Sequence, residues 1–176
     1  HHYDRPPRDV QRRVLADQLA RIEACRSGEH APGLDKPVVV HCRKAVGELL
    51  PILSASEIPP ERFVFHCFTE PPEDARAVLD FGAMISFTGV ATYKNAREVL
   101  ASARLVPLDR IMVETDAPFL SPVPVRGRRP CEPAYAIHTA RFLAEARGED
   151  WDAFHRAIDD NTERFFGVRA PAGGRA

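Results

Sequence analysis

Three apolar segments of this chain each end in side chains that can bind a metal ion; the segments are 37–41, 62–66 and 110–116. Two of them end in a histidine and the third ends in a pair of carboxylates. The carboxyl ends of neighbouring parallel strands meet at one mouth of a barrel, where two imidazoles and a carboxylate can bind a divalent cation. We therefore expect a metal-dependent enzyme. The predicted metal ligands are His41, His66 and Asp116.

A single histidine at a strand end is better explained as a core residue bonded to a backbone carbonyl. Two histidines in the same relative position, with an aspartate in the third, favour a metal site. Glu114 and Asp116 share a face by alternation, so the two carboxylates can divide metal ligation and proton transfer between them. We expect both to be catalytic. The alternative for Asp116 is a turn-capping role before Ala117 and Pro118.

A cysteine follows each histidine, and the two pairs suggest a Cys₂His₂ zinc site. Adjacent side chains of an extended strand point to opposite faces, so His41 and Cys42 cannot both reach one ion. We interpret Cys42 and Cys67 as small packing residues. The four cysteines of the chain form no CxxC pair, and we expect a reducing, cytoplasmic setting.

Arginines could form a positive rim near this site. Arg43 lies two residues after His41, and an arginine cluster lies in the loop after Asp116; its members are Arg126, Arg128 and Arg129. Guanidinium groups bind phosphate well, so we expect Arg43, Arg126 and Arg128 to bind substrate. The alternative for the cluster is a solvated surface loop. Segment 93–95 could also face the mouth.

Hydrophobic periodicity predicts strands that alternate with helices. The strands are 38–40, 63–65, 83–87 and 111–113. The helices are 8–26, 45–54, one that starts near Pro72 and is closed by Gly82, 95–103, 134–147, and 150–166 with Asp150 as N-cap and Gly167 as stop. Pro51 should kink or split the second helix. Alternating units of this kind indicate an α/β fold with a parallel sheet.

Composition excludes several classes of protein. The chain has 176 residues, 44% of them hydrophobic, and a net charge of −1, which is typical of one domain whose overall charge selects no partner. No apolar run reaches the length of a membrane span, and no signal peptide opens the chain, so we expect no membrane partner.

Several motifs together resemble the TatD family of metal-dependent hydrolases; they are PVVVHCR (37–43), FHCFT (65–69), ISFTG (85–89), VETDAPFL (113–120), RGR (126–128), CEP (131–133) and NTERFFG (161–167). The resemblance implies a TIM-like (β/α) barrel of the amidohydrolase type and a 3′-directed deoxyribonuclease. It implies that His41 and His66 bind one ion, and that Asp116 binds a second and helps to activate water. Up to two divalent ions (Mg, Mn or Zn) are expected.

Two family features are absent from the chain, namely a His-x-His pair on a first strand and a bridging glutamate on a third. Segment 1–4 resembles the stretch just after that glutamate. Cys131 replaces the family's usual asparagine. A closed barrel takes about 250 residues, so we expect residues 1–168 to be the C-terminal two-thirds of a single barrel that lacks its first strands. Residues 169–176 are expected to be a frayed tail. Such a chain should be poorly stable and inactive when isolated, with an open apolar edge at the His41 strand.

We therefore expect a hydrolase that cleaves phosphodiester bonds of DNA as an exonuclease and acts as a monomer. A deacylase of D-aminoacyl-tRNA, or another ester or amide hydrolase on the same fold, is one alternative. A non-catalytic remnant that binds nucleic acid or a partner through its arginine-rich loop is another.

Overall fold

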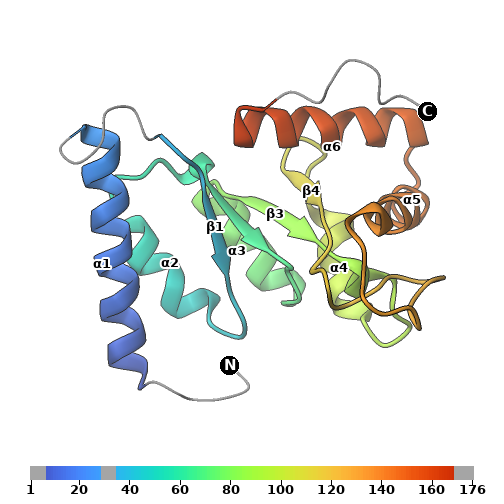
Figure 1. The fold of residues 1–176 in the computed structure, drawn as a ribbon, viewed down its shortest axis with the longest axis horizontal. Helices are drawn as coiled ribbons and strands as arrows, with labels where there is room; N and C mark the ends of the chain where they lie inside the picture. The colour runs from blue at the N-terminus through green and yellow to red at the C-terminus, as the bar shows by residue number, and fades with distance from the viewer. Residues whose placement is uncertain (1–6, 29–34, 169–176) are drawn as a thin grey trace.

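Four short parallel strands form one sheet in the order β1-β2-β3-β4. A computed structural model describes residues 7–28 and 35–168 (Figure 1). The strands are β1 (Val38–His41), β2 (Phe63–His66), β3 (Met84–Phe87) and β4 (Ile111–Val113). Each predicted strand is confirmed, within one residue at either end. The start of the chain and the expected frayed tail lie outside the described residues.

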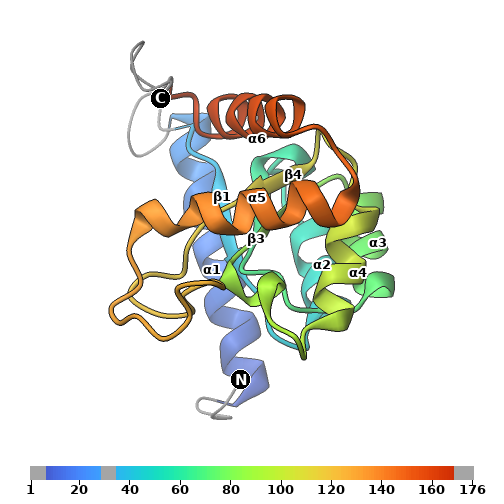
Figure 2. The ribbon, with the colours of Figure 1, turned by 90° about the vertical axis from the view of Figure 1, so that its right-hand side faces the viewer.

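The α-helices are distributed along the sheet from its β1 edge to its β4 edge. They are α1 (Arg8–Ser27), α2 (Val46–Ser54), α3 (Pro72–Phe81), α4 (Arg97–Leu105), α5 (Ala136–Arg147) and α6 (Trp151–Phe166). α1 and α2 lie beside β1, whereas α5 and α6 contact β4 (Figure 1). α2, α3 and α4 gather on one side of the sheet, and α6 runs above α5 in the turned view (Figure 2). The predicted α/β class with parallel βα units is confirmed.

Local signals explain several of the helix ends. Asp150 caps α6 by accepting a hydrogen bond from the Ala153 N–H, and Gly82 and Gly167 close α3 and α6 with positive φ angles, as predicted. The expected split of α2 is wrong, because the helix runs through Pro51. Burial of α2 against the core outweighs the one backbone hydrogen bond that proline removes.

Two other helices begin later than expected. α4 starts two residues after the predicted position 95, and α5 starts at Ala136 after a 3₁₀ turn, Pro133–Tyr135. Proline at the first position of that turn fixes φ and supplies no N–H to a preceding carbonyl, which suits a turn start.

The two faces of the sheet bury different residues. One face carries large side chains that pack under the helices; they are Phe63, Phe65, Ile85, Phe87 and Ile111. The opposite face, here called the inner face, carries Val64, Met84 and Met112, which pack against Phe165 of α6. Val39 pairs with Val64 and so shares the inner face, yet it is 52% exposed. The inner face is therefore covered near β4 and uncovered near β1.

The side chain of Asn161 connects α6 to β4 and to the segment before it. Its buried amide donates hydrogen bonds to the backbone oxygens of Leu108 and Ile111, at 2.9 and 2.8 Å. These bonds satisfy carbonyls that would otherwise be buried without a partner. Among the described residues, no helix is both long and apolar enough to cross a bilayer.

Candidate metal and substrate site

The two candidate histidines lie side by side on the inner face. His41 ends β1, His66 ends β2, and the two residues are partners in the parallel ladder. Their ring centroids are 6.0 Å apart, and the ring planes are tilted by 41°. The structure thus brings together two of the three predicted ligands at one edge of the sheet.

His66 lies between two carboxylates from the segment that follows β4. Its Nδ1 is 3.0 Å from Glu114 Oε1, and its Nε2 is 3.5 Å from Asp116 Oδ1. The same Glu114 oxygen accepts the backbone N–H of Cys67 at 2.8 Å. The third predicted ligand, Asp116, is therefore also at the site, and Glu114 holds the imidazole in place.

These contacts change the acidity of both partners. The hydrogen bond to Glu114 raises the pKa of His66 above its usual value, although burial acts in the opposite direction. Burial alone would raise the pKa of Glu114. Its hydrogen bonds with the His66 side chain and the Cys67 amide outweigh burial and lower that pKa. Each group therefore favours the charged form of the other.

Ser86 makes room for the contact between His66 and Glu114. β3 separates β2 from β4, and two strand spacings amount to about 10 Å. Side chains from β2 and β4 can meet across that distance only over a small residue on β3. Ser86 occupies this place on the inner face, and its hydroxyl also bonds to Glu114. It is the one polar residue in the apolar β3 run, a signal that the sequence analysis did not use.

The donor set fits a divalent cation in its chemistry. When the imidazole is neutral, as a metal ligand must be, the bond from Nδ1 to Glu114 selects the tautomer whose Nε2 lone pair faces Asp116. Two ligands of one ion, each at about 2.0–2.1 Å, lie roughly 3–3.5 Å from each other, and the separation of Nε2 from Asp116 Oδ1 is 3.5 Å. Within residues 7–28 and 35–168, however, no three His, Cys, Asp or Glu side chains lie close enough to form a complete site.

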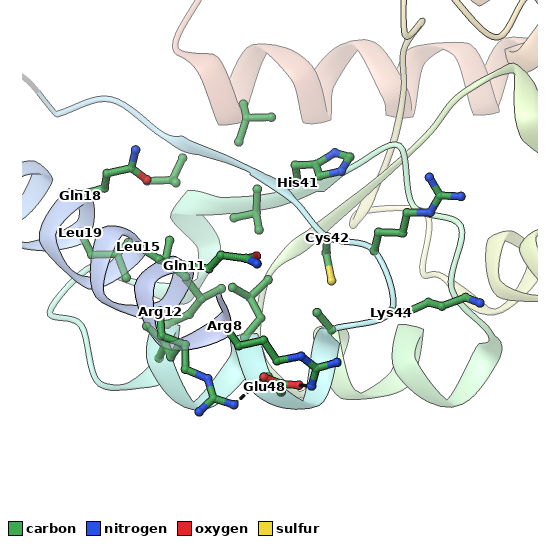
Figure 3. A pocket seen from close by; sticks show the side chains of 18 of the residues that line it. Arg8, Gln11, Arg12, Leu15, Gln18, Leu19, His41, Cys42, Lys44 and Glu48 are labelled. Carbon is green, nitrogen blue, oxygen red and sulfur yellow. Dashed lines mark hydrogen bonds and ion pairs between the residues drawn. The ribbon is translucent and has the colours of Figure 1, made fainter. Parts of the chain in front are cut away.

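The neighbouring thiols are poor ligands. Cys42 is buried in the core behind β1, opposite His41 (Figure 3). Cys67 Sγ lies 3.2 Å from Thr88 Oγ1. Burial raises the pKa of both thiols to about 11, so neither is a thiolate near neutral pH. Cys42 packs in the core, as predicted.

The predicted substrate arginines come from two loops at opposite edges of the sheet. Arg43 is exposed in the loop after β1, and Arg126 and Arg128 are exposed in the loop after β4. The guanidinium of Arg126 lies 3.9 Å above the ring of Tyr93, a cation–π contact. Tyr93 in turn donates a hydrogen bond to the Ser121 carbonyl oxygen at 3.0 Å. Segment 93–95 is expected from the sequence as one that could face the mouth, but no local pattern predicts this stacking.

A groove of about 590 Å³ runs between α1, β1 and α2 (Figure 3). Val38, Val40 and Leu53 line it, and so does His41. Arg8 and Arg12 of α1 bind Glu48 of α2 at 2.7 and 2.6 Å across its rim. The groove follows the free edge of β1, which the sequence analysis predicted to be open and apolar.

Gly89 supports the loop that carries Asp116 and the arginines. A Cβ atom at this position would lie 2.7 Å from Pro122 N and 2.9 Å from Pro122 Cα, and closer still to the Leu120 oxygen. The loop after β4 therefore rests directly on the backbone after β3, and only glycine allows this approach.

We expect Gly89→Ala to lower the free energy of unfolding by about 1–3 kcal/mol, because the added methyl group collides with backbone that cannot move freely. Urea unfolding measures this change. Gly47→Ala is the matched control. No atom lies within 4 Å of its added Cβ, and alanine in a helix should raise stability by about 0.5–1 kcal/mol. Equal effects of the two substitutions would contradict the packing role of Gly89.

The contact between His66 and Glu114 predicts a pH dependence of stability in the metal-free chain. The raised pKa of His66 contributes stability that is complete below pH 6.5, the ordinary pKa of the imidazole, and is lost as the pH rises through the folded pKa. The lowered pKa of Glu114 contributes stability above pH 4.5, the ordinary pKa of the carboxyl group, which is lost as the pH falls through the folded pKa.

The stability difference between wild type and Glu114→Gln should therefore be largest between pH 4.5 and 6.5. Urea unfolding across this range, with a chelator present, tests it. Glu145→Gln, at an exposed position of α5, is the control. A difference that stays constant from acid to alkaline pH would show that the two side chains do not interact in solution.

Several known proteins named as hydrolases or nucleases are similar to this chain. The Escherichia coli K12 protein named "Uncharacterized metal-dependent hydrolase YcfH" is 42% identical over 137 residues, which cover 78% of this chain and 51% of that protein. Bacillus subtilis YabD, with the same description, is 31% identical over 168 residues, or 96% of this chain and 62% of that protein. Human "3'-5' RNA nuclease TATDN2" is 34% identical over 142 residues, or 78% of this chain and 19% of that protein. This chain thus spans about half to three-fifths of the length of the two bacterial relatives.

A solved structure agrees with the fold. The crystal structure of YJJV, a TatD homologue from E. coli K12, matches with a TM-score of 0.81 and 28% identity, over 94% of this chain and 60% of that one. The TIM-like fold expected from the sequence is supported by this match. Residues 1–167 match the family described as "TatD related DNase", and the chain belongs to the TatD family.

Proposed function

We propose that this chain carries the greater part of the active site of a metal-dependent hydrolase that cleaves phosphodiester bonds of DNA from the 3′ end. The observation that supports it most is the His66 imidazole, fixed by Glu114 on one nitrogen and facing Asp116 with the other. That arrangement is typical of a histidine prepared for a metal ion. The names of the relatives support metal dependence and hydrolysis.

In this proposal each residue has a defined role. His66, Asp116 and His41 hold one or two divalent ions, of which Zn²⁺ and Mn²⁺ suit imidazole better than Mg²⁺. A bound ion would polarise a phosphoryl oxygen and lower the pKa of a bound water. Asp116 would orient the attacking water and accept its proton, and Glu114 would keep the His66 tautomer fixed.

The arginines bind the substrate backbone. Arg43, Arg126 and Arg128 are exposed in the loops after β1 and β4, and in this proposal they pair with phosphates on either side of the scissile bond. RNA is the second candidate substrate, because a human relative is named as an RNA nuclease. We further propose a cytoplasmic monomer, which the free thiols of all four cysteines support.

We also propose that residues 1–168 are the C-terminal two-thirds of one barrel domain. The partial coverage of the relatives supports this, as does the exposure of Val39 on the inner face, where the apolar residues Val64, Met84 and Met112 are buried. Further strands paired to the β1 edge would cover Val39 and bring more ligands to the ions.

A chimaera tests the domain proposal. The part of E. coli YcfH that precedes its match to this chain would be fused in front of it. We expect the chimaera to hydrolyse single-stranded DNA with Mn²⁺ or Mg²⁺, and the 176-residue chain to be at least about a hundredfold slower, because positioned ligands are missing. Equal activity of the isolated chain would refute the proposal.

Substitutions in the chimaera test the assigned roles. Asp116→Ala and His66→Ala should each lower kcat by about a hundredfold or more, and Glu114→Gln by about ten- to a hundredfold. The control is Asp80→Ala, at an exposed site on α3. Parallel assays with RNA and with an aminoacyl-RNA ester identify the substrate. If nucleic acid still binds in all variants and none differs in turnover, the protein is a binding module and not an enzyme.

A further inference from the structure

The loop after β1 presents Arg43 between two anchored residues. Cys42 is buried, and Lys44 adopts a φ of 53°, in the left-handed region. For a residue other than glycine this conformation is unfavourable, and a specific contact offsets its cost. The contact is a hydrogen bond from the Lys44 N–H to Glu70 Oε1, at 2.7 Å.

Glu70 is itself fixed from the other side. It lies in the loop after β2 and is only 5% exposed. Its backbone oxygen accepts a hydrogen bond from Ser102 Oγ at 2.8 Å, and Ser102 is fully buried on α4. Nearby, the Phe68 N–H donates to the Ser86 oxygen at 2.9 Å. The backbone of Glu70 is therefore anchored to α4, and its buried carboxylate connects the β1 loop to this anchored segment.

We propose that Glu70 is a positioning residue for substrate binding, whose carboxylate fixes the 42–44 turn and holds Arg43 where it meets a nucleic-acid phosphate. This inference rests on the proposed function, because the phosphate contact of Arg43 is part of that function. The bond joins the loops that follow β1 and β2, the strands that end in His41 and His66. It therefore sets the position of Arg43 relative to both imidazoles.

A positioning role and a purely electrostatic role of Glu70 predict opposite changes in the affinity for nucleic acid when its carboxylate is removed. Removal of a negative charge beside a phosphate site should strengthen the binding of a polyanion. Loss of the bond to Lys44 should weaken it, because the turn must then be ordered when substrate binds. The direction of the change in affinity therefore separates a positioning role from simple electrostatics.

The experiment measures binding of a fluorescein-labelled single-stranded DNA oligonucleotide to the 176-residue chain, by fluorescence anisotropy with a chelator present. Glu70→Met should weaken binding about three- to tenfold. Glu70→Gln keeps an oxygen acceptor and should bind at least as tightly as wild type. Glu73→Gln, on the exposed start of α3, controls for the loss of one charge.

A double substitution tests whether Glu70 acts through Arg43. In the Arg43→Ala background, Glu70→Met should cause no further weakening, because the arginine that it positions is gone. Amide hydrogen exchange provides a second readout: Glu70→Met should expose the Lys44 N–H while β1 keeps its protection. If Glu70→Met fails to fold by circular dichroism, Ser102→Ala replaces it, since that change frees the Glu70 backbone and keeps its charge.

The outcomes are distinguishable. If Arg43→Ala weakens binding but Glu70→Met leaves it unchanged or strengthens it, the inference is overturned and the proposed function stands. The inference also fails if Glu70→Met weakens binding equally with and without Arg43. If Arg43→Ala has no effect, the phosphate role of Arg43 fails, and the positioning role fails with it.

Discussion

The hydrogen bond between His66 Nδ1 and Glu114 Oε1 joins the end of β2 to the segment after β4, across the intervening β3. The other features of the site depend on it. It selects the imidazole tautomer, and it places the Glu114 oxygen where the Cys67 amide also donates to it. Without this bond, His66 would have no fixed orientation toward Asp116, and a metal ion would have to order both side chains at the cost of affinity.

The inner face of the sheet changes from apolar to polar along the strand direction. Val64, Met84 and Met112 form an apolar layer with Phe165, and the next layer toward the carboxyl ends holds His66, Ser86 and Glu114. Layers of inward-facing side chains are the normal filling of a TIM-like barrel. The apolar layer excludes water from beneath the polar one, which strengthens the contact between His66 and Glu114. One face of four short strands thus provides both packing and chemistry.

Strand positions and the histidines at their ends could be predicted from the sequence, because they depend on local patterns: continuous apolar runs that stop at a polar residue. The carboxylate pair could be predicted for the same reason. The contacts that arrange the site could not. Glu70 and Lys44 are 26 residues apart, and Gly89 meets a loop more than thirty residues downstream. Such contacts depend on how separate loops pack against each other, and no local pattern in the sequence indicates them.

The backbone conformation of the turns after β1 and β2 could not be predicted from the sequence either. Lys44 and Cys67 both have positive φ angles, at 53° and 46°, where a sequence-based argument would look for glycine. Each is held by a carboxylate instead: Glu70 accepts the Lys44 amide, and Glu114 accepts the Cys67 amide. The left-handed residue follows His66 by one position and His41 by three, so each turn begins shortly after the histidine that ends the strand.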